Sequence, residues 1–172
     1  MVLHDLVAER FSAIWRAQEN RDAELLVPHV SDDYLERSRA SFEELDRQAR
    51  THRIEDERLR DVAVAWPAED AAPDTAQAYL AFMVRHSIVD LRTGAIVGGD
   101  AVTTRAWTAC WTFTLDPRRG WLVDRLAAVS RSQDGRMPAA GEWPGLPAGW
   151  YSLRDRPSEW RYWDGAAWGQ SA

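Results

Sequence analysis

Residues 101–115 are predicted to form a β-strand, because from Thr104 onward their side chains alternate with a period of two. One side of this segment carries the apolar residues Trp107, Ala109, Trp111, Phe113 and Leu115. The other side carries small residues, most of them with hydroxyl groups, and this mixture of aromatic and β-branched residues favours extended backbone. We expect the central strand of a sheet, with the rest of the chain covering its aromatic face.

Two amphipathic helices are predicted ahead of that strand. Residues 2–18 place apolar side chains every three to four positions, at Leu3, Leu6, Val7, Phe11, Ile14 and Trp15. Ser31 is expected to cap a second helix that runs to about residue 50 and buries Tyr34, Leu35, Phe42 and Leu45. The opposite side of this second helix alternates in charge, which is typical of a solvated surface. Between the helices, Asp22 is expected to cap a short turn.

Three further strands are predicted at residues 58–66, 76–89 and 121–130, from alternating side chains. In 76–89, one side carries Ala78, Leu80, Phe82, Val84, His86 and Ile88. Turn residues separate the strands at 90–94 and 116–120. Two helices followed by about four consecutive antiparallel strands predict an α+β fold, in which a curved sheet wraps around the helices.

Composition narrows the classes of partner. The chain has 172 residues, 45% of them hydrophobic and 28% charged, with a net charge of −6. This charge argues against nucleic acid or an anionic membrane surface as a partner. Cys110 is the single cysteine, so we expect no intrachain disulfide. The chain also lacks cysteine and histidine residues at metal-ligand spacing, and we expect no metal site and no cofactor. No signal peptide and no apolar stretch of about 20 residues is visible, which predicts a cytoplasmic protein that reaches a membrane only through a partner.

Five short motifs occur in a characteristic order. They are Phe-x3-Trp-x6-Asp at 11–22, Ser-Asp-Asp-Tyr-Leu-Glu-Arg at 31–37, Asp-x3-Gly-x3-Gly at 90–98, Trp-Thr-Phe-Thr at 111–114 and Gly-Trp-Leu-Val-Asp at 120–124. Together they resemble the bacterial form of the translocase-of-inner-membrane 44-like domain, over about residues 5–130. The resemblance implies a cone-shaped nuclear transport factor 2-like fold, with a pocket between the helices and the concave sheet. Ala109 or Cys110 stands where that family tends to carry an acidic residue.

The remaining residues divide into a linker and an aromatic tail, giving predicted units of 1–130, 131–146 and 147–172. Proline and glycine punctuate the linker. The motifs Pro-Ala-Gly-Trp-Tyr at 147–151 and Arg-Tyr-Trp-Asp-Gly-x-x-Trp at 161–168 resemble a short Trp-rich domain of unknown function common in actinobacterial proteins, over about residues 147–170. The expected module is a small β-hairpin unit. Its surface would consist of Trp150, Tyr151, Trp160, Tyr162, Trp163 and Trp168. Because so short a segment cannot bury much core, it must dock on the main domain or offer its rings to a partner.

Two sets of residues are candidates for a site. The first could bind an apolar ligand or a protein partner, and consists of Trp15, Tyr79, Trp107, Trp111 and Phe113. The alternative for these aromatic rings is ordinary core packing. The second set could supply acid-base chemistry: His86 and Asp90 share one strand face, and Asp124 lies on a neighbouring strand. The alternative for these three residues is a satisfied core histidine and two structural carboxylates.

We therefore expect a non-catalytic binding or scaffold protein that holds a protein partner or an apolar ligand, with the Trp-rich module as an added contact surface. One alternative is a pocket enzyme, an isomerase, dehydratase or hydrolase, that acts on a small apolar substrate. Another is a structural homodimer that pairs through the sheet face carrying Thr104, Thr108, Thr112 and Thr114.

Overall fold

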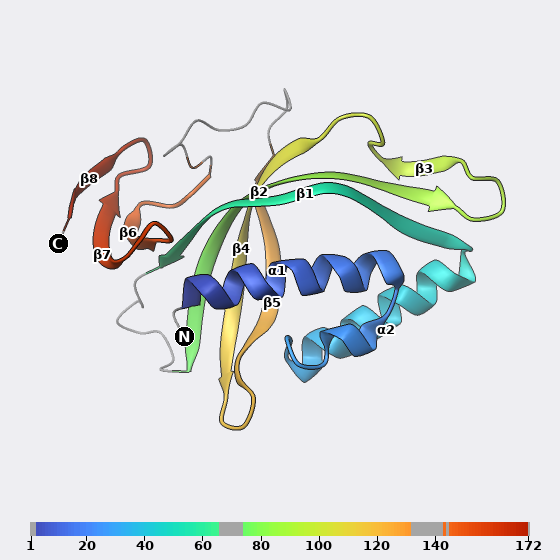
Figure 1. Ribbon diagram of the computed structural model, residues 1–172, viewed down its shortest axis with the longest axis horizontal. Coiled ribbons are helices and arrows are strands. Elements are labelled where there is room, and N and C mark those ends of the chain that lie inside the picture. Colours follow the sequence, from blue (N-terminus) through green and yellow to red (C-terminus); the bar gives the residue numbers. More distant parts are fainter. Residues whose placement is uncertain (1–2, 66–73, 132–142, 144, 172) are drawn as a thin grey trace.

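The computed structural model describes residues 3–65, 74–131, 143 and 145–171 (Figure 1). Helix α1 spans Leu3–Asn20, a 3₁₀ turn spans Ala23–Leu26, and helix α2 spans Asp32–Arg47. The strands are β1 (Arg50–Ala65), β2 (Thr75–Asp90), β3 (Ile96–Gly99), β4 (Arg105–Asp116), β5 (Gly120–Arg131), β6 (Gly149–Leu153), β7 (Arg156–Trp163) and β8 (Trp168–Ser171).

Within the described residues, all eight strands belong to one antiparallel sheet. Their order is β5-β4-β2-β1-β6-β7-β8, and β3 pairs with β2 beyond the start of β4. In Figure 1, both helices lie against one face of this sheet, and β6, β7 and β8 lie at one end of it. The sheet is therefore the main body of the protein, and the helices cover only part of one face.

The expected fold class, an α+β cone of the nuclear transport factor 2-like type with about four strands and a small Trp-rich C-terminal β-hairpin module, is wrong. The structure is largely one sheet of eight strands with two α-helices among the described residues. The reason is that β6 pairs with the end of β1 through Ala63–Ala65, so the C-terminal strands continue the same sheet. In addition, β1 starts at Arg50, eight residues earlier than its alternating pattern predicted.

The two predicted helices are confirmed, with their buried faces. Leu6, Phe11 and Ile14 of α1 are buried against the sheet. Helix α2 begins as its cap predicted, because the backbone N–H of Tyr34 donates to the Ser31 hydroxyl oxygen at 3.2 Å. It ends two to three residues early, at Arg47, and Ala49 then takes a left-handed conformation with a φ of 51°. That break allows the chain to turn directly into β1.

The alternation of side chains with a period of two correctly predicted which residues of the central strands lie on each face of the sheet. Phe82 of β2 and Trp111 and Phe113 of β4 belong to the core that the helices cover. On β2, Tyr79 and Ala81 point to the opposite face, where they join a second buried cluster. Strands β1, β2 and β4 are thus buried on both sides, each side by a different layer.

The second layer is formed by the C-terminal segment. Its buried members are Trp143, Leu146, Tyr151, Leu153 and Trp163, which pack with Ala63, Tyr79 and Ala81. The rings of Tyr79 and Tyr151 meet edge to face with centroids 5.7 Å apart, and the indole N–H of Trp163 donates to the Leu146 carbonyl at 3.0 Å. The segment thus shares its core with the main sheet. The three-part division of the chain stays a prediction, and most of the linker at 131–146 lies outside the described residues.

Among the helices that the structure describes, none is both long enough and apolar enough to cross a membrane. The cytoplasmic location stays a prediction.

Replacing Tyr151 with alanine should lower the free energy of unfolding by about 3 kcal/mol, because it removes a buried ring from the joint with Tyr79. The matched control is Tyr162→Ala on β7, whose side chain is 40% exposed and which should cost less than about 1 kcal/mol. Urea unfolding followed by circular dichroism measures both values. Equal losses in the two variants would contradict docking of the C-terminal strands on the sheet.

Candidate functional site

A cavity of about 300 Å³ lies between α1 and the helix-facing side of the sheet. Its wall is mainly apolar and draws on α1, β1, β2, β4 and β5. The lining residues are Phe11, Ile14, Trp15, Gln18, His52, Phe82, Val84, His86, Trp107, Ala109, Trp111, Leu126, Ala127 and Ala128. This volume falls at the small end of the range for ligand pockets.

Residue spacing explains why a space remains here. Phe11 and Trp15 lie one helical turn apart on α1, and their rings pack around Phe82 with centroids 5.4 and 5.9 Å from it. On the sheet side, Ala109 of β4 is paired directly with Ala128 of β5. Ala109 is buried, whereas Ala128 is exposed on the edge strand β5, so the small side chains here leave the space between the rings open toward that edge.

The structure brings together three of the five aromatic residues proposed to bind a ligand or partner. Trp15, Trp107 and Trp111 all line the cavity. Phe113 is fully buried deeper in the same core, with its ring 6.2 Å from that of Trp111. Tyr79 lies on the opposite face of the sheet, under the C-terminal segment.

The three acid-base candidates are not brought together. His86 lines the cavity, whereas Asp90 and Asp124 do not. The Asp90 carboxylate accepts hydrogen bonds from the backbone N–H groups of Arg92 and Thr93 in the turn after β2, and these bonds lower its pKa. The Asp124 carboxylate accepts a hydrogen bond from the Ser31 hydroxyl at 2.8 Å. Both carboxylates thus hold local structure.

His86 has a partner that sequence reasoning missed, His52 on β1. Nδ1 of His52 and Nε2 of His86 are 2.5 Å apart, and the two rings stack with centroids 4.8 Å apart at 22°. Burial lowers the pKa of both imidazoles, and the nearby His86 lowers the pKa of His52 further, to about 4. The pair is therefore neutral at pH 7, with one ring donating its N–H to the other at the end of the apolar cavity.

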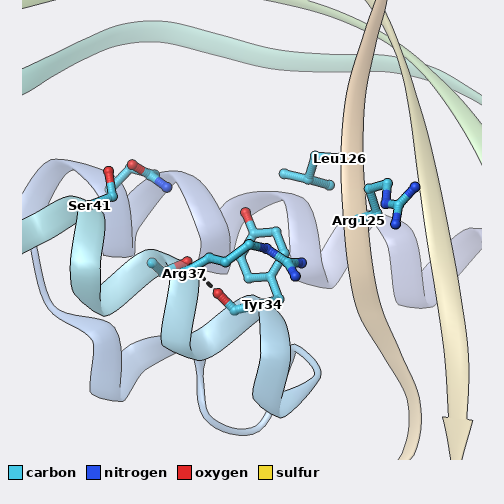
Figure 2. Close-up of a pocket in the computed structure, with 7 residues that line it drawn as sticks. Tyr34, Arg37, Ser41, Arg125 and Leu126 are labelled. Atoms are coloured by element: carbon cyan, nitrogen blue, oxygen red, sulfur yellow. Dashed lines mark hydrogen bonds between the residues drawn. The ribbon is translucent and has the colours of Figure 1, made fainter.

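A second, more polar cleft of about 410 Å³ adjoins the cavity (Figure 2). It is lined by Gln18, Tyr34, Arg37, Ser38, Ser41, Arg125 and Leu126. Gln18 and Leu126 line both spaces. In Figure 2, Tyr34, Arg37 and Ser41 rise from α2, and Leu126 extends from β5 toward the helices. No carboxylate is present among these lining residues, although the chain as a whole carries 27 acidic residues.

The predicted surface of the Trp-rich module is divided between burial and exposure. Tyr151 and Trp163 are buried in the second core, and Trp168 packs partly against it. Trp150 and Tyr162 are each 40% exposed, with ring centroids 5.5 Å apart. Trp160 is half-buried. Within the described residues, no group of three or more metal-ligating side chains gathers anywhere in the protein.

Comparison with known proteins identifies no family. No family model matches the chain, and no curated protein matches it. A solved structure that resembles it is the intermembrane space region of the chloroplast protein ARC6, with 14% identity and a TM-score of 0.49; the match covers 72% of this chain and 91% of that one. The two family resemblances drawn from the sequence stay predictions.

The histidine pair predicts a pH-dependent stability. Because the pKa of folded His52 is about 4 and that of an unfolded histidine about 6.5, the unfolded chain binds more protons between these values. The free energy of unfolding should therefore be nearly constant above about pH 7.5 and fall by roughly 2 kcal/mol as the pH drops from there to about 4.5. That is less than the whole shift would give, since the imidazole is partly exposed.

In the variant His52→Gln, urea unfolding at the same pH values should show a clearly smaller fall. A residual fall is expected from His86 and His29, whose pKa values are also lowered by burial. An unchanged pH dependence in His52→Gln would contradict this assignment.

Proposed function

We propose that this protein binds an apolar small molecule in the cavity between α1 and the sheet, without transforming it. The observation that carries the proposal is the set of three tryptophan rings, Trp15, Trp107 and Trp111, around a space that small alanine side chains of β4 and β5 also line. Aromatic and aliphatic walls with a few polar groups at one end are the usual chemistry of a small-molecule site.

Packing supports a ligand in this space. Protein interiors are close-packed, and the core that contains the cavity-lining rings also holds fully buried side chains such as Phe113, Leu80 and Val62. Rings that border an unfilled space lose dispersion contacts on one side. An apolar molecule would restore these contacts and release water from the cavity, so its binding is favoured by the same forces that build the core.

Filling the cavity should abolish binding. In the variant Ala128→Phe, a ring is added at the β5 edge of the cavity, next to Ala109, and affinity for the probe 1-decanol should fall at least about tenfold in isothermal titration calorimetry. The control Ala40→Phe adds the same ring to an exposed alanine of α2 outside the cavity and should leave affinity unchanged. The proposal fails if the wild-type protein shows no saturable binding of decanol, or if both variants bind it equally.

The His52–His86 pair favours a second candidate function, a pocket hydrolase. A neutral imidazole beside an apolar substrate can take a proton from water or from a hydroxyl group, which is general-base catalysis. Neither Asp90 nor Asp124 is needed for this chemistry, since neither lines the cavity.

Hydrolysis of p-nitrophenyl hexanoate tests this candidate. The hydrolysis rate should exceed that of free imidazole at the same concentration. In the variant His86→Gln, the part of the rate above that of free imidazole should be at least about a hundredfold lower. The control Asp124→Asn lies outside the cavity and should keep the full rate. If the wild-type protein is no faster than free imidazole, the hydrolase candidate is wrong.

A further inference from the structure

The cleft beside the cavity has a chemistry of its own, which the sequence did not suggest. The two spaces meet at Gln18 and Leu126, which line both of them. A molecule whose apolar body fills the cavity would therefore emerge between these two side chains. Its far end would face the polar cleft between α2 and β5 (Figure 2).

Arg37 lines this cleft and carries a positive charge that could bind an anionic group. One of its N–H groups donates to the backbone carbonyl of Asp124 at 2.7 Å, and its guanidinium lies 5.8 Å from the centre of the Tyr34 ring. These two contacts hold the side chain across the cleft. Its other N–H groups have no carboxylate partner among the described residues.

Neighbouring arginines differ from Arg37 in this respect. On the same helix, Arg39 pairs with Glu24 at 2.7 Å and Arg47 pairs with Glu44. On the β4–β5 hairpin, Arg119 pairs with Asp32 at 3.0 Å. Acidic residues thus neutralise these three arginines, while Arg37 and Arg125, the two that line the cleft, have no ion pair with a carboxylate among the described residues.

Hydroxyl groups complete the donor set. Burial raises the pKa of Tyr34 to about 12, although the nearby Arg37 opposes the shift, so the phenol stays protonated and can donate a hydrogen bond. Ser41, one helical turn after Arg37 on α2, is exposed and also lines the cleft. Arg125 also lines the cleft. Because side chains alternate along β5, its side chain begins on the opposite face of the sheet from that of Leu126. Its contribution is therefore mainly positive charge acting over a longer distance.

We propose that the cavity and the cleft form one site for an amphipathic carboxylate, a molecule with a hydrocarbon body and a single terminal carboxylate group. The body occupies the tryptophan-lined cavity, and the carboxylate accepts hydrogen bonds from the guanidinium of Arg37 and the hydroxyl of Tyr34. Arginine binds carboxylates with two parallel N–H donors, which suits a single anionic head. The net charge of −6 disfavours a polyanion. This inference rests on the proposed function, because the hydrocarbon needs the cavity.

Calorimetric titrations with decanoate and 1-decanol test it, because the two probes share a chain of equal length and differ in the charged head. At pH 8 and low salt, the wild-type protein should bind decanoate about tenfold more tightly than decanol. The variant Arg37→Gln should lose this preference, and Arg37→Lys should keep part of it, since a lysine retains the charge without the paired donors. The matched control Arg39→Gln, which changes an ion-paired arginine outside the cleft, should keep the preference in full.

Each outcome decides between the two proposals. Raising the salt concentration should reduce the affinity for decanoate and leave that for decanol unchanged. If decanol binds and decanoate binds no more tightly, or if the preference survives Arg37→Gln, the carboxylate site is wrong and the apolar cavity stands. If neither probe binds, the proposed function fails, and this inference fails with it.

Discussion

The antiparallel pairing of β1 with β2 sets the arrangement of every other layer. Val62 lies opposite Leu80, and the next pair joins Ala63 to Tyr79. Because side chains alternate along a strand, the first pair faces the helices and the second faces the C-terminal segment. A slip of one residue would turn the Tyr79 ring into the helix-covered core and move Leu80 out of it. Two different cores therefore depend on one register, and a chain that pairs wrongly here loses both of them.

The same register places the histidine pair and the contact with the C-terminal strands at opposite ends of β1. Near its start, the pairing of Ile54 with His86 brings His52 diagonally next to His86, at the end of the apolar cavity. Near its end, Ala63 pairs with Tyr79 on one side and with Leu153 on the other. The C-terminal strands thus attach to the part of β1 that lies away from the histidine pair. They cover the face of the sheet opposite the cavity, so the second layer adds buried contacts without closing the space beside α1.

Features set by nearby residues could be predicted from the sequence, and features set by distant pairing could not. The cap at Ser31 and the facing of Trp107 and Trp111 follow from local spacing, and the structure confirms them. In contrast, the first residues of β1 are mostly polar, so neither that half of the strand nor His52 had a periodic signal. The pairing of β6 with β1 involves three alanine and valine positions that any strand could offer. Arg37 belongs to a helix surface of alternating charge, and only the position of β5 distinguishes it from its solvated neighbours. Aromatic density in the tail indicated a small module that either docks or stays free, because sequence alone does not show which sheet edge is open to it.

Alanine has two opposite effects in this sheet, and the difference explains why the cavity exists. On the face toward the C-terminal segment, Ala63 and Ala81 allow the bulky residues of the second layer to approach the strands, and the space above them is filled. On the helix face, Ala109 and Ala128 line the cavity beside Phe11 and Trp15, whose rings pack against Phe82, and Ala128 is exposed at the β5 edge. Alanine therefore allows close packing under the C-terminal layer and leaves an open space beside the helix layer, at the β5 edge. A cavity of this kind is determined by the spacing between layers, which is why a ligand-sized space arises next to a well-packed core in the same sheet.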